Sequence, residues 1–143
     1  GSAMANCTNL ELKELPETIT TLNYRSFYDC NRLALTKLPS KLTTIPTECF
    51  YSCSKMTLKE LPEGIISIEQ KAFYNCQNLQ LSKLPEAITK IDSSVFENCY
   101  RLVLEELPQG ITENGRETNI DYYPQIEVKA NRNFSTHTKP HNK

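Results

Sequence analysis

Apolar side chains return along this chain with a constant step of 23 residues. The clearest example is a Leu-Pro pair that occurs at Leu15-Pro16, Leu38-Pro39, Leu61-Pro62, Leu84-Pro85 and Leu107-Pro108. Three further columns of residues keep the same step without an insertion. They consist of Cys7, Cys30, Cys53, Cys76 and Cys99; of Phe27, Phe50, Phe73 and Phe96; and of Leu12, Leu35, Leu58, Leu81 and Leu104. Such a step is the signature of a repeat architecture, in which one structural unit is copied and stacked.

Each unit contains two short segments with the character of extended chain. The Leu33-x-Leu35 step has the two-residue alternation of a strand with one buried face. The following Pro39 has no N–H group and therefore ends the ladder. A second extended piece, residues 19–22 in the first copy, is rich in β-branched residues. The polar segment before each Phe and Cys suits a helical turn or an irregular arc, so each unit is predicted to be one circuit of a β-rich solenoid.

A single circuit cannot bury its own apolar side chains, and stacked neighbours must cover them. The pattern fails after Ile111, where Asn114 occupies the next aliphatic position. We therefore predict a solenoid over residues 6–115. Residues 116–143 are expected to form a C-terminal segment in which 120–128 cap the last circuit and a flexible tail follows from about residue 130. Residues 1–5 read as a cloning remnant.

The order of Leu-Pro, two aliphatic residues, Ala-Phe and Cys resembles the BspA-like, or Treponema-type, leucine-rich repeat over about residues 7–112. The resemblance implies leucine-rich repeats stacked as a curved, right-handed superhelix with parallel strands. It also implies a surface-exposed or secreted protein with an adhesion or interaction role. This chain departs from the family where a Gly usually follows the second aliphatic residue. The four residues in that position are Asn23, Pro46, Glu69 and Asp92.

Composition and charge exclude several classes of partner. The chain is 38% hydrophobic and 23% charged, which is ordinary for a soluble globular protein. The net charge is -1, and the lysines and arginines form no basic stripe, so we expect no nucleic-acid partner. No apolar run approaches the roughly 20 residues of a membrane-spanning helix, so we expect no membrane insertion.

The six cysteines allow three interpretations. Buried free thiols are favoured, because the cysteine column repeats in register with the Leu and Phe columns and Cys packs as a small apolar residue. Disulfides between neighbouring circuits are an alternative, although parallel side chains point the same way and a column of five leaves one partner missing. A zinc site is the third, and it lacks a C-x2-C pair. We expect neither a metal nor a cofactor.

Catalysis is not predicted from the residues of this chain. Its two histidines, His137 and His141, fall in the expected tail, where a general base cannot be held in place. No Gly-rich phosphate loop is present. The protein is therefore expected not to be an enzyme.

Three columns of residues are candidates for binding a protein partner. The exposed residues of the predicted sheet are Lys13, Thr36, Lys59, Ser82 and Glu105. The position before each Leu-Pro pair alternates in charge, through Glu14, Lys37, Glu60, Lys83 and Glu106. This alternation predicts ion pairs between neighbouring circuits. Aromatic residues that either shield the core or form a recognition strip are Tyr28, Tyr51 and Tyr74.

We expect a binding or adhesion module of a surface or secreted protein, with an unidentified protein partner for which a host protein is one candidate. The first alternative is an intracellular interaction domain, an effector or regulatory segment, for which six reduced cysteines would be natural. The second alternative is a purely structural spacer.

Overall fold

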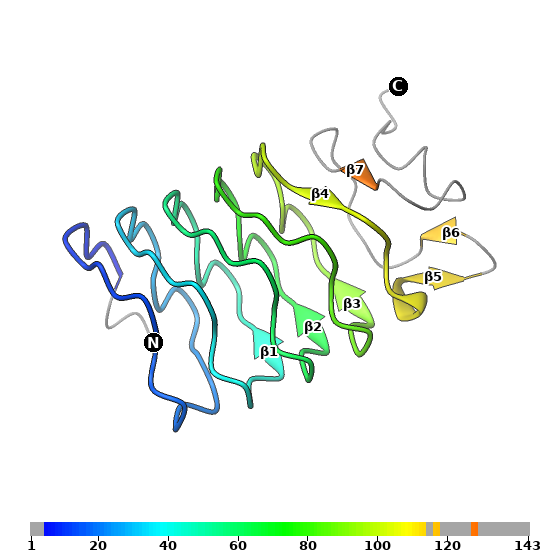
Figure 1. Cartoon of the computed structure of the whole chain (residues 1–143), viewed down its shortest axis with the longest axis horizontal. Coiled ribbons are helices and arrows are strands. Elements are labelled where there is room, and N and C mark those ends of the chain that lie inside the picture. The colour runs from blue at the N-terminus through cyan, green and yellow to red at the C-terminus, as the bar shows by residue number, and fades with distance from the viewer. Residues whose placement is uncertain (1–4, 114–115, 118–126, 129–143) are drawn as a thin grey trace.

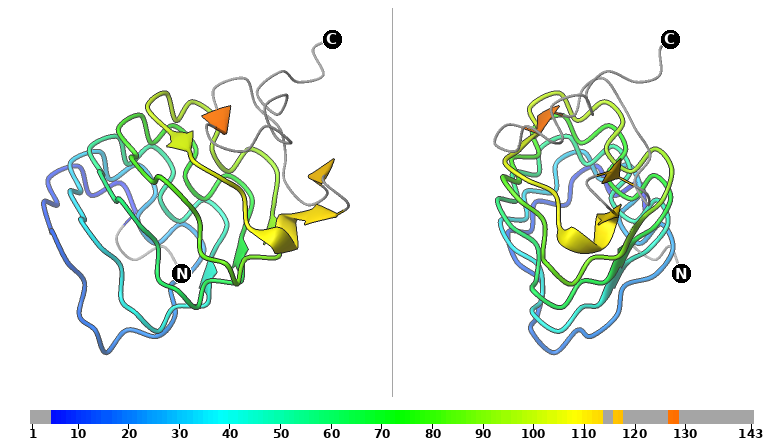
Figure 2. Two further views of the ribbon diagram at one scale, coloured as in Figure 1. Left: turned by 45° about the vertical axis from the view of Figure 1, so that its right-hand side comes forward. Right: turned by 90° about the vertical axis from the view of Figure 1, so that its right-hand side faces the viewer.

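In a computed structural model that describes residues 5–113, 116–117 and 127–128, the chain winds into a stack of similar coils. Figure 1 shows the coils side by side, from the blue N-terminal end to the yellow last repeat, and Figure 2 shows them superimposed around one shared interior. The repeats start at the cysteine column, so the first repeat is residues 7–29, the second 30–52, the third 53–75 and the fourth 76–98. The stacked solenoid predicted from the 23-residue step is confirmed.

Parallel strands come from the second extended piece of successive repeats. β1 (Thr44–Ile45), β2 (Ser67–Ile68) and β3 (Lys90–Ile91) form one parallel sheet in that order. Their register joins residues one repeat apart in the sequence, since Thr44 lies opposite Ser67 and Ser67 opposite Lys90. Each strand buries its isoleucine and leaves the preceding residue at the surface.

The remaining elements lie at the C-terminal end. They are β4 (Val103–Leu104), the 3-10 helix η1 (Gln109–Ile111), β5 (Thr112–Glu113), β6 (Arg116–Glu117) and β7 (Glu127–Val128). β4 and β7 pair in parallel, and β5 and β6 pair antiparallel. Other parts of the expected cap and tail lie outside the described residues.

The prediction that each Leu-x-Leu step is a strand is wrong for most of the described repeats. Only the last one forms a strand there, namely β4. In the second repeat, single bonds replace a ladder, because the N–H of Ala34 donates to the Leu12 carbonyl at 3.1 Å and the N–H of Thr36 to that of Lys13 at 3.0 Å. The following Pro39 has no N–H to donate, so the pairing ends at that point.

The expected extended piece at residues 19–22 also forms no ladder with β1. In later repeats, the N–H of Glu69 donates to the Ile45 carbonyl and that of Asp92 to the Ile68 carbonyl, both at 2.9 Å. The equivalent residue in the second repeat is Pro46, which lacks this donor. The first repeat is therefore tied less firmly to the second on the strand side.

The polar segment before each cysteine is an arc with an alternating hydrogen-bond pattern. In residues 48–52, the N–H groups of Glu48, Phe50 and Ser52 donate to carbonyls of the next repeat at 2.8 to 3.0 Å. The N–H groups between them, those of Cys49 and Tyr51, donate three residues back within the arc. This alternation explains why the segment is neither a helix nor a strand.

Two columns of the arc adopt the left-handed backbone conformation. The first consists of Arg25, Glu48, Lys71 and Ser94, and the second of Asn6, Asp29, Ser52, Asn75 and Asn98, with φ between 52° and 63°. The second column uses Asn, Asp and Ser, and Asn and Asp tolerate this region best among residues with a side chain. The position where the family usually has Gly does not have a positive φ in this chain.

The core consists of the predicted columns. Phe27, Phe50, Phe73 and Phe96 stack with ring centroids 5.5 to 6.0 Å apart and planes within 8° of parallel. The inner members of the Leu column are buried, but Leu12 is 39% exposed, which corrects the expectation that the whole column is core. Leu12 lies in the first repeat, where no described residue covers the N-terminal side.

Candidate functional site

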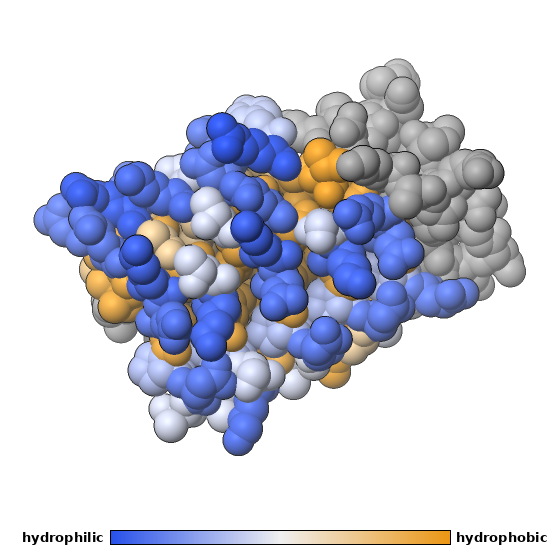
Figure 3. Space-filling view, viewed as in Figure 1, coloured by the Kyte–Doolittle hydropathy of each residue, from blue (hydrophilic) through white to orange (hydrophobic). Residues whose placement is uncertain are grey.

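One edge of the solenoid carries the Leu-Pro pairs. Figure 3 shows one face of the molecule, in the orientation of Figure 1. Hydrophilic side chains cover most of it, and apolar residues are visible between their rows (Figure 3). All five residues of the predicted exposed column are exposed, namely Lys13, Thr36, Lys59, Ser82 and Glu105. The prediction that they belong to the sheet is wrong, because they follow the Leu-x-Leu segments and the β1-β2-β3 sheet is formed by other residues.

Two clefts lie along this edge, one after the other. The first has a volume of about 140 Å³ and is lined by residues from 59–63 of the third repeat and 82–86 of the fourth. The second has a volume of about 250 Å³ and is lined by Glu17 and by residues from 37–40 and 60–63. Both clefts share Glu60, Leu61 and Glu63, so they form one groove across four repeats. We call it the Leu-Pro groove.

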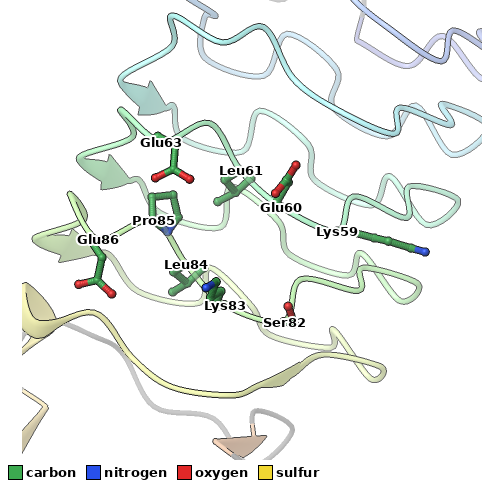
Figure 4. Close-up of a pocket in the computed structure, with 9 residues that line it drawn as sticks. All are labelled: Lys59, Glu60, Leu61, Glu63, Ser82, Lys83, Leu84, Pro85 and Glu86. Atoms are coloured by element: carbon green, nitrogen blue, oxygen red, sulfur yellow. The ribbon is translucent and has the colours of Figure 1, made fainter.

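The Leu-Pro groove combines an apolar floor with charged walls. Figure 4 shows Leu61, Leu84 and Pro85 between Glu60 and Glu63 on one side and Lys83 and Glu86 on the other. The leucines are almost fully buried, so they offer only a small apolar surface. Charges of both signs stand above them in water, where they are free to meet a partner.

The predicted ion pairs between neighbouring members of the charge column do not form. Among the described residues, the ion pairs within 4.0 Å join Arg25 to Glu48, Arg32 to Glu11, and Lys90 to Asp92. None includes Lys37, Glu60 or Lys83. These side chains are exposed, and an exposed pair gains too little Coulomb energy to fix two long side chains.

One carboxylate of the groove has a fixed partner. Glu17 Oε1 accepts hydrogen bonds from the Ser40 hydroxyl at 2.7 Å and from the Ser40 N–H at 3.1 Å. The bond from the hydroxyl, followed by that from the N–H, lowers the pKa of Glu17 below its ordinary value. This contact links the first repeat to the second and holds one end of the groove in place.

The tyrosine column forms a tight stack on the arc side. The rings of Tyr28 and Tyr51 are 4.5 Å apart and those of Tyr51 and Tyr74 are 4.7 Å apart, with planes within 14° of parallel. The Arg25 guanidinium lies 4.4 Å from the centre of the Tyr28 ring. Burial, and then the neighbouring tyrosines, raise the pKa of Tyr51. Because the ring faces contact each other, the stack offers a partner ring edges and hydroxyl groups.

A charge column that the sequence reasoning missed lies next to this stack. It is the first of the two left-handed columns of the arc. Its residues Arg25, Glu48 and Lys71 alternate in charge. Here a pair does form, since Arg25 Nε donates to Glu48 Oε1, and the Glu48 side chain is only 15% exposed. The alternation at the 23-residue step could have revealed this column.

The sequence reasoning also missed Glu63 and Glu86 as residues of the Leu-Pro groove. Both directly follow a Leu-Pro pair, and this shared position was the available signal.

The cysteines are free thiols, and all except the half-buried Cys7 are buried. Three of them donate S–H hydrogen bonds to phenylalanine carbonyls of earlier arcs, at 3.0 to 3.1 Å. The pairs are Cys53 with Phe27, Cys76 with Phe50, and Cys99 with Phe73. Burial raises the pKa of Cys99 to about 12 and that of Cys76 well above its usual range. The column therefore has a structural role as a set of neutral donors between repeats.

Within the residues that the structure describes, no group of three or more His, Cys, Asp and Glu side chains is placed to hold a metal ion. No helix in that part is long and apolar enough to cross a membrane. His137 and His141 lie outside the described residues.

Comparison with solved structures identifies similar solenoids in bacteria. A leucine rich cell surface protein from Faecalibacterium prausnitzii is 29% identical, with a TM-score of 0.64 over 73% of this chain and 28% of its own. A leucine-rich repeat protein from Bacteroides ovatus is 21% identical, with a TM-score of 0.66 over 86% and 32%. The leucine rich repeat protein of T. pallidum is 24% identical, with a TM-score of 0.56 over 90% and 60%. The chain thus spans less than two thirds of the length of each.

The sequence profile of the BspA type leucine rich repeat region matches residues 1–120 in 6 copies. Among curated proteins, no significant relative is found. The matched region includes the whole repeat array described above, with its Leu, Phe and Cys columns. The chain belongs to the BspA-type leucine-rich repeat family.

Proposed function

We propose that this chain is a non-catalytic protein-binding module whose contact surface is the Leu-Pro groove. The observation that carries the proposal is the juxtaposition of two consecutive clefts with charged residues that form no ion pair in the described structure. Interfaces gain specificity from charges placed around a buried apolar centre. The groove has this composition in three consecutive repeats, which is a larger surface than one loop could provide.

The form of the groove favours an extended segment of a partner protein. The two clefts are lined by successive repeats and follow one another along the groove, so they fit successive side chains of an extended peptide better than a compact small molecule. Lys37, Glu60 and Lys83 alternate along the groove, so a partner with charges of both signs would fit best. The tyrosine stack is a second surface, which offers mainly hydroxyl groups.

We further propose display at the cell surface or secretion, with adhesion as the role. Support comes from the F. prausnitzii neighbour, which is described as a cell surface protein and is 29% identical. This chain spans 28% of the F. prausnitzii protein. We therefore only propose, for this chain, the location of that longer protein.

A pull-down with three matched variants tests the groove. The groove variant carries Lys37→Ala, Glu60→Ala and Lys83→Ala. The control variant carries Thr20→Ala, Thr43→Ala and Lys90→Ala, which are exposed positions on the strand side. The third variant replaces Tyr28, Tyr51 and Tyr74 by Phe, which keeps the ring stack and removes the hydroxyl groups.

The groove variant is expected to weaken capture of partner proteins from host or bacterial extracts by about tenfold or more, equivalent to about 1.4 kcal/mol. The control and tyrosine variants should bind like the unmodified chain, and all melting temperatures should agree within a few degrees. Capture that survives all three sets of substitutions would show that the described repeats are a spacer.

A further inference from the structure

The tyrosine stack of Tyr28, Tyr51 and Tyr74 holds its rings closer together than the phenylalanine stack of the core. Neighbouring tyrosine centroids are 4.5 and 4.7 Å apart, whereas neighbouring phenylalanine centroids are 5.5 to 6.0 Å apart. The phenylalanines are at most 5% exposed, but the three tyrosines are only half-buried. The tyrosine stack is therefore the closely spaced row of rings that a solute in water can reach.

Backbone hydrogen bonds hold the stacked tyrosines in register. The Tyr51 carbonyl accepts from the Asp29 N–H at 2.6 Å, and the Tyr74 carbonyl accepts from the Ser52 N–H at 2.8 Å. Asp29 and Ser52 directly follow Tyr28 and Tyr51, so each bond joins one tyrosine position to the equivalent position of the next repeat. The three side chains therefore leave the backbone at equivalent points of their arcs.

This geometry brings the reactive ring carbons of neighbouring tyrosines together. The ring planes of Tyr28 and Tyr51 are 14° apart, and those of Tyr51 and Tyr74 are 11° apart. In such parallel rings, the carbon ortho to each hydroxyl lies over the ortho carbon of its neighbour at about the centroid separation. Side-chain fluctuations of roughly 1 Å then bring these carbons to about 3 to 3.5 Å, the separation from which bonds form.

We propose that the tyrosine stack is a site of oxidative cross-linking, where a one-electron oxidant of the peroxidase class joins neighbouring tyrosines. Each of two phenols gives one electron to the oxidant and its hydroxyl proton to water, which leaves two phenoxyl radicals. Their unpaired electrons form a bond between the ortho carbons, and the hydrogen on each of these carbons moves to its own phenol oxygen. Two electrons and two protons leave the pair, and one hydrogen peroxide takes them up to become two waters.

Such a cross-link fastens one repeat to the next. Tyr28, Tyr51 and Tyr74 belong to the first, second and third repeats, and each bond would close a loop of 23 residues. The stability of a solenoid depends on the interfaces between its repeats, and a covalent loop also restricts the unfolded chain. The column ends in the fourth repeat, where Glu97 takes the tyrosine position. The inference is independent of the partner that the Leu-Pro groove binds.

Peroxidase and hydrogen peroxide, followed by peptide mapping, test the proposal on the whole chain. The stacked tyrosines fall in three different tryptic peptides, which are residues 26–32, 42–55 and 72–83. All thiols are reduced and alkylated before digestion, because a disulfide would also remove two hydrogens. Conversion of free tyrosine in a parallel sample shows that the oxidant is active.

Two matched variants accompany the unmodified chain. Tyr51→Phe keeps a ring in the middle of the stack but removes the phenol that both neighbours need. Tyr100→Phe removes a tyrosine that is 60% exposed and is not a member of the stack. Both changes keep the aromatic ring, so both variants should fold.

The expected products are peptide 42–55 joined to 26–32 and to 72–83, each with two hydrogens fewer than the sum of its parts. Tyr51→Phe should lower the yield of cross-links within one chain by about tenfold or more, because Tyr28 and Tyr74 are two repeats apart. Tyr100→Phe should leave this yield unchanged. Absence of both products from the unmodified chain, or an equal yield from Tyr51→Phe, would overturn the proposal. Cross-links that join only separate chains and increase with protein concentration would overturn it as well.

Thermal unfolding tests whether the cross-links fasten the repeats. The cross-linked monomer should melt at least about 5 °C above the unoxidised chain. Tyr51→Phe treated with the same oxidant should show no such rise, which separates the cross-link from other oxidation products. An equal melting temperature of the cross-linked and unoxidised chains would overturn the fastening of the repeats.

Discussion

The first repeat and the third repeat have closely similar sequence patterns but differ in side-chain burial and in strand pairing. Leu58 of the third repeat is 0% exposed, whereas Leu12 at the same position of the first is 39% exposed. The third repeat contributes β2, which pairs on both sides, while residues 19–22 of the first form no ladder. A leucine of this pattern is therefore core only where a neighbour covers it, so stability in this molecule belongs to the interfaces between repeats.

The largest expected effect compares two positions of the phenylalanine stack. Phe73→Ala should lower the free energy of unfolding by about 3 to 5 kcal/mol, the usual range for a buried aromatic. Phe73 stacks on both Phe50 and Phe96, whereas Phe27 stacks on Phe50 alone among the described residues. Phe27→Ala should therefore cost less. Urea unfolding of both variants measures the difference, and equal losses would show that the ends of the stack are as well packed as its middle.

The next effect compares the two leucines directly. Leu58→Ala removes a fully buried side chain and should cost about 2 to 5 kcal/mol. Leu12→Ala should cost less than about 1 kcal/mol, because much of that side chain is already in water. Both values come from denaturant midpoints at unchanged slope. A Leu12→Ala loss as large as that of Leu58→Ala would mean that the first repeat is covered in solution.

The columns in the sequence predict the fold well and the contacts of the surface poorly. Apolar columns such as the phenylalanines predict the stacked fold, because only stacking of the repeats can bury them. By contrast, the alternation from Lys37 to Glu60 predicts pairs that do not form, since sign alone does not bring exposed side chains together. The Leu-x-Leu pattern also predicts a strand where most repeats have none, because the pattern does not show that single hydrogen bonds, such as that from Ala34 to Leu12, join neighbouring repeats there.

Alkaline pH should destabilise the inner repeats through their thiols. Burial raises the pKa of Cys99 from an ordinary value of 9.0 to about 12. Between these values the unfolded chain binds fewer protons than the folded one at this residue, so the free energy of unfolding falls as pH rises. The fall should be about 1.4 kcal/mol per pH unit for each such thiol. Cys99→Ala should reduce the slope between pH 9 and pH 12 in urea titrations, and an unchanged slope would contradict the burial of this thiol.

The smallest effect separates the two charge columns. Glu48→Ala removes a partly buried partner of Arg25 and should cost about 1 kcal/mol. Glu60→Ala removes an exposed carboxylate without an ion pair in the described structure and should change stability by less than about 0.5 kcal/mol. Thermal unfolding at low and at high salt distinguishes them, because only the Glu48 effect should shrink with added salt. Equal effects would show that the Arg25 pair contributes nothing to stability.

The hydrogen bonds of the arc give the stack a direction. Arc N–H groups such as that of Phe50 donate forward to the next repeat, whereas N–H groups on the strand side, such as that of Glu69, donate backward. The two ends of the solenoid are therefore chemically different. At one end the arc offers acceptors and the strand side offers donors, and at the other end the arc offers donors and the strand side offers acceptors. Head-to-tail addition of a unit sets these donors against acceptors, and head-to-head contact would set like groups against each other. A gene for such a protein can lengthen or shorten by whole units and still encode a chain in which the bonds between repeats run in one direction.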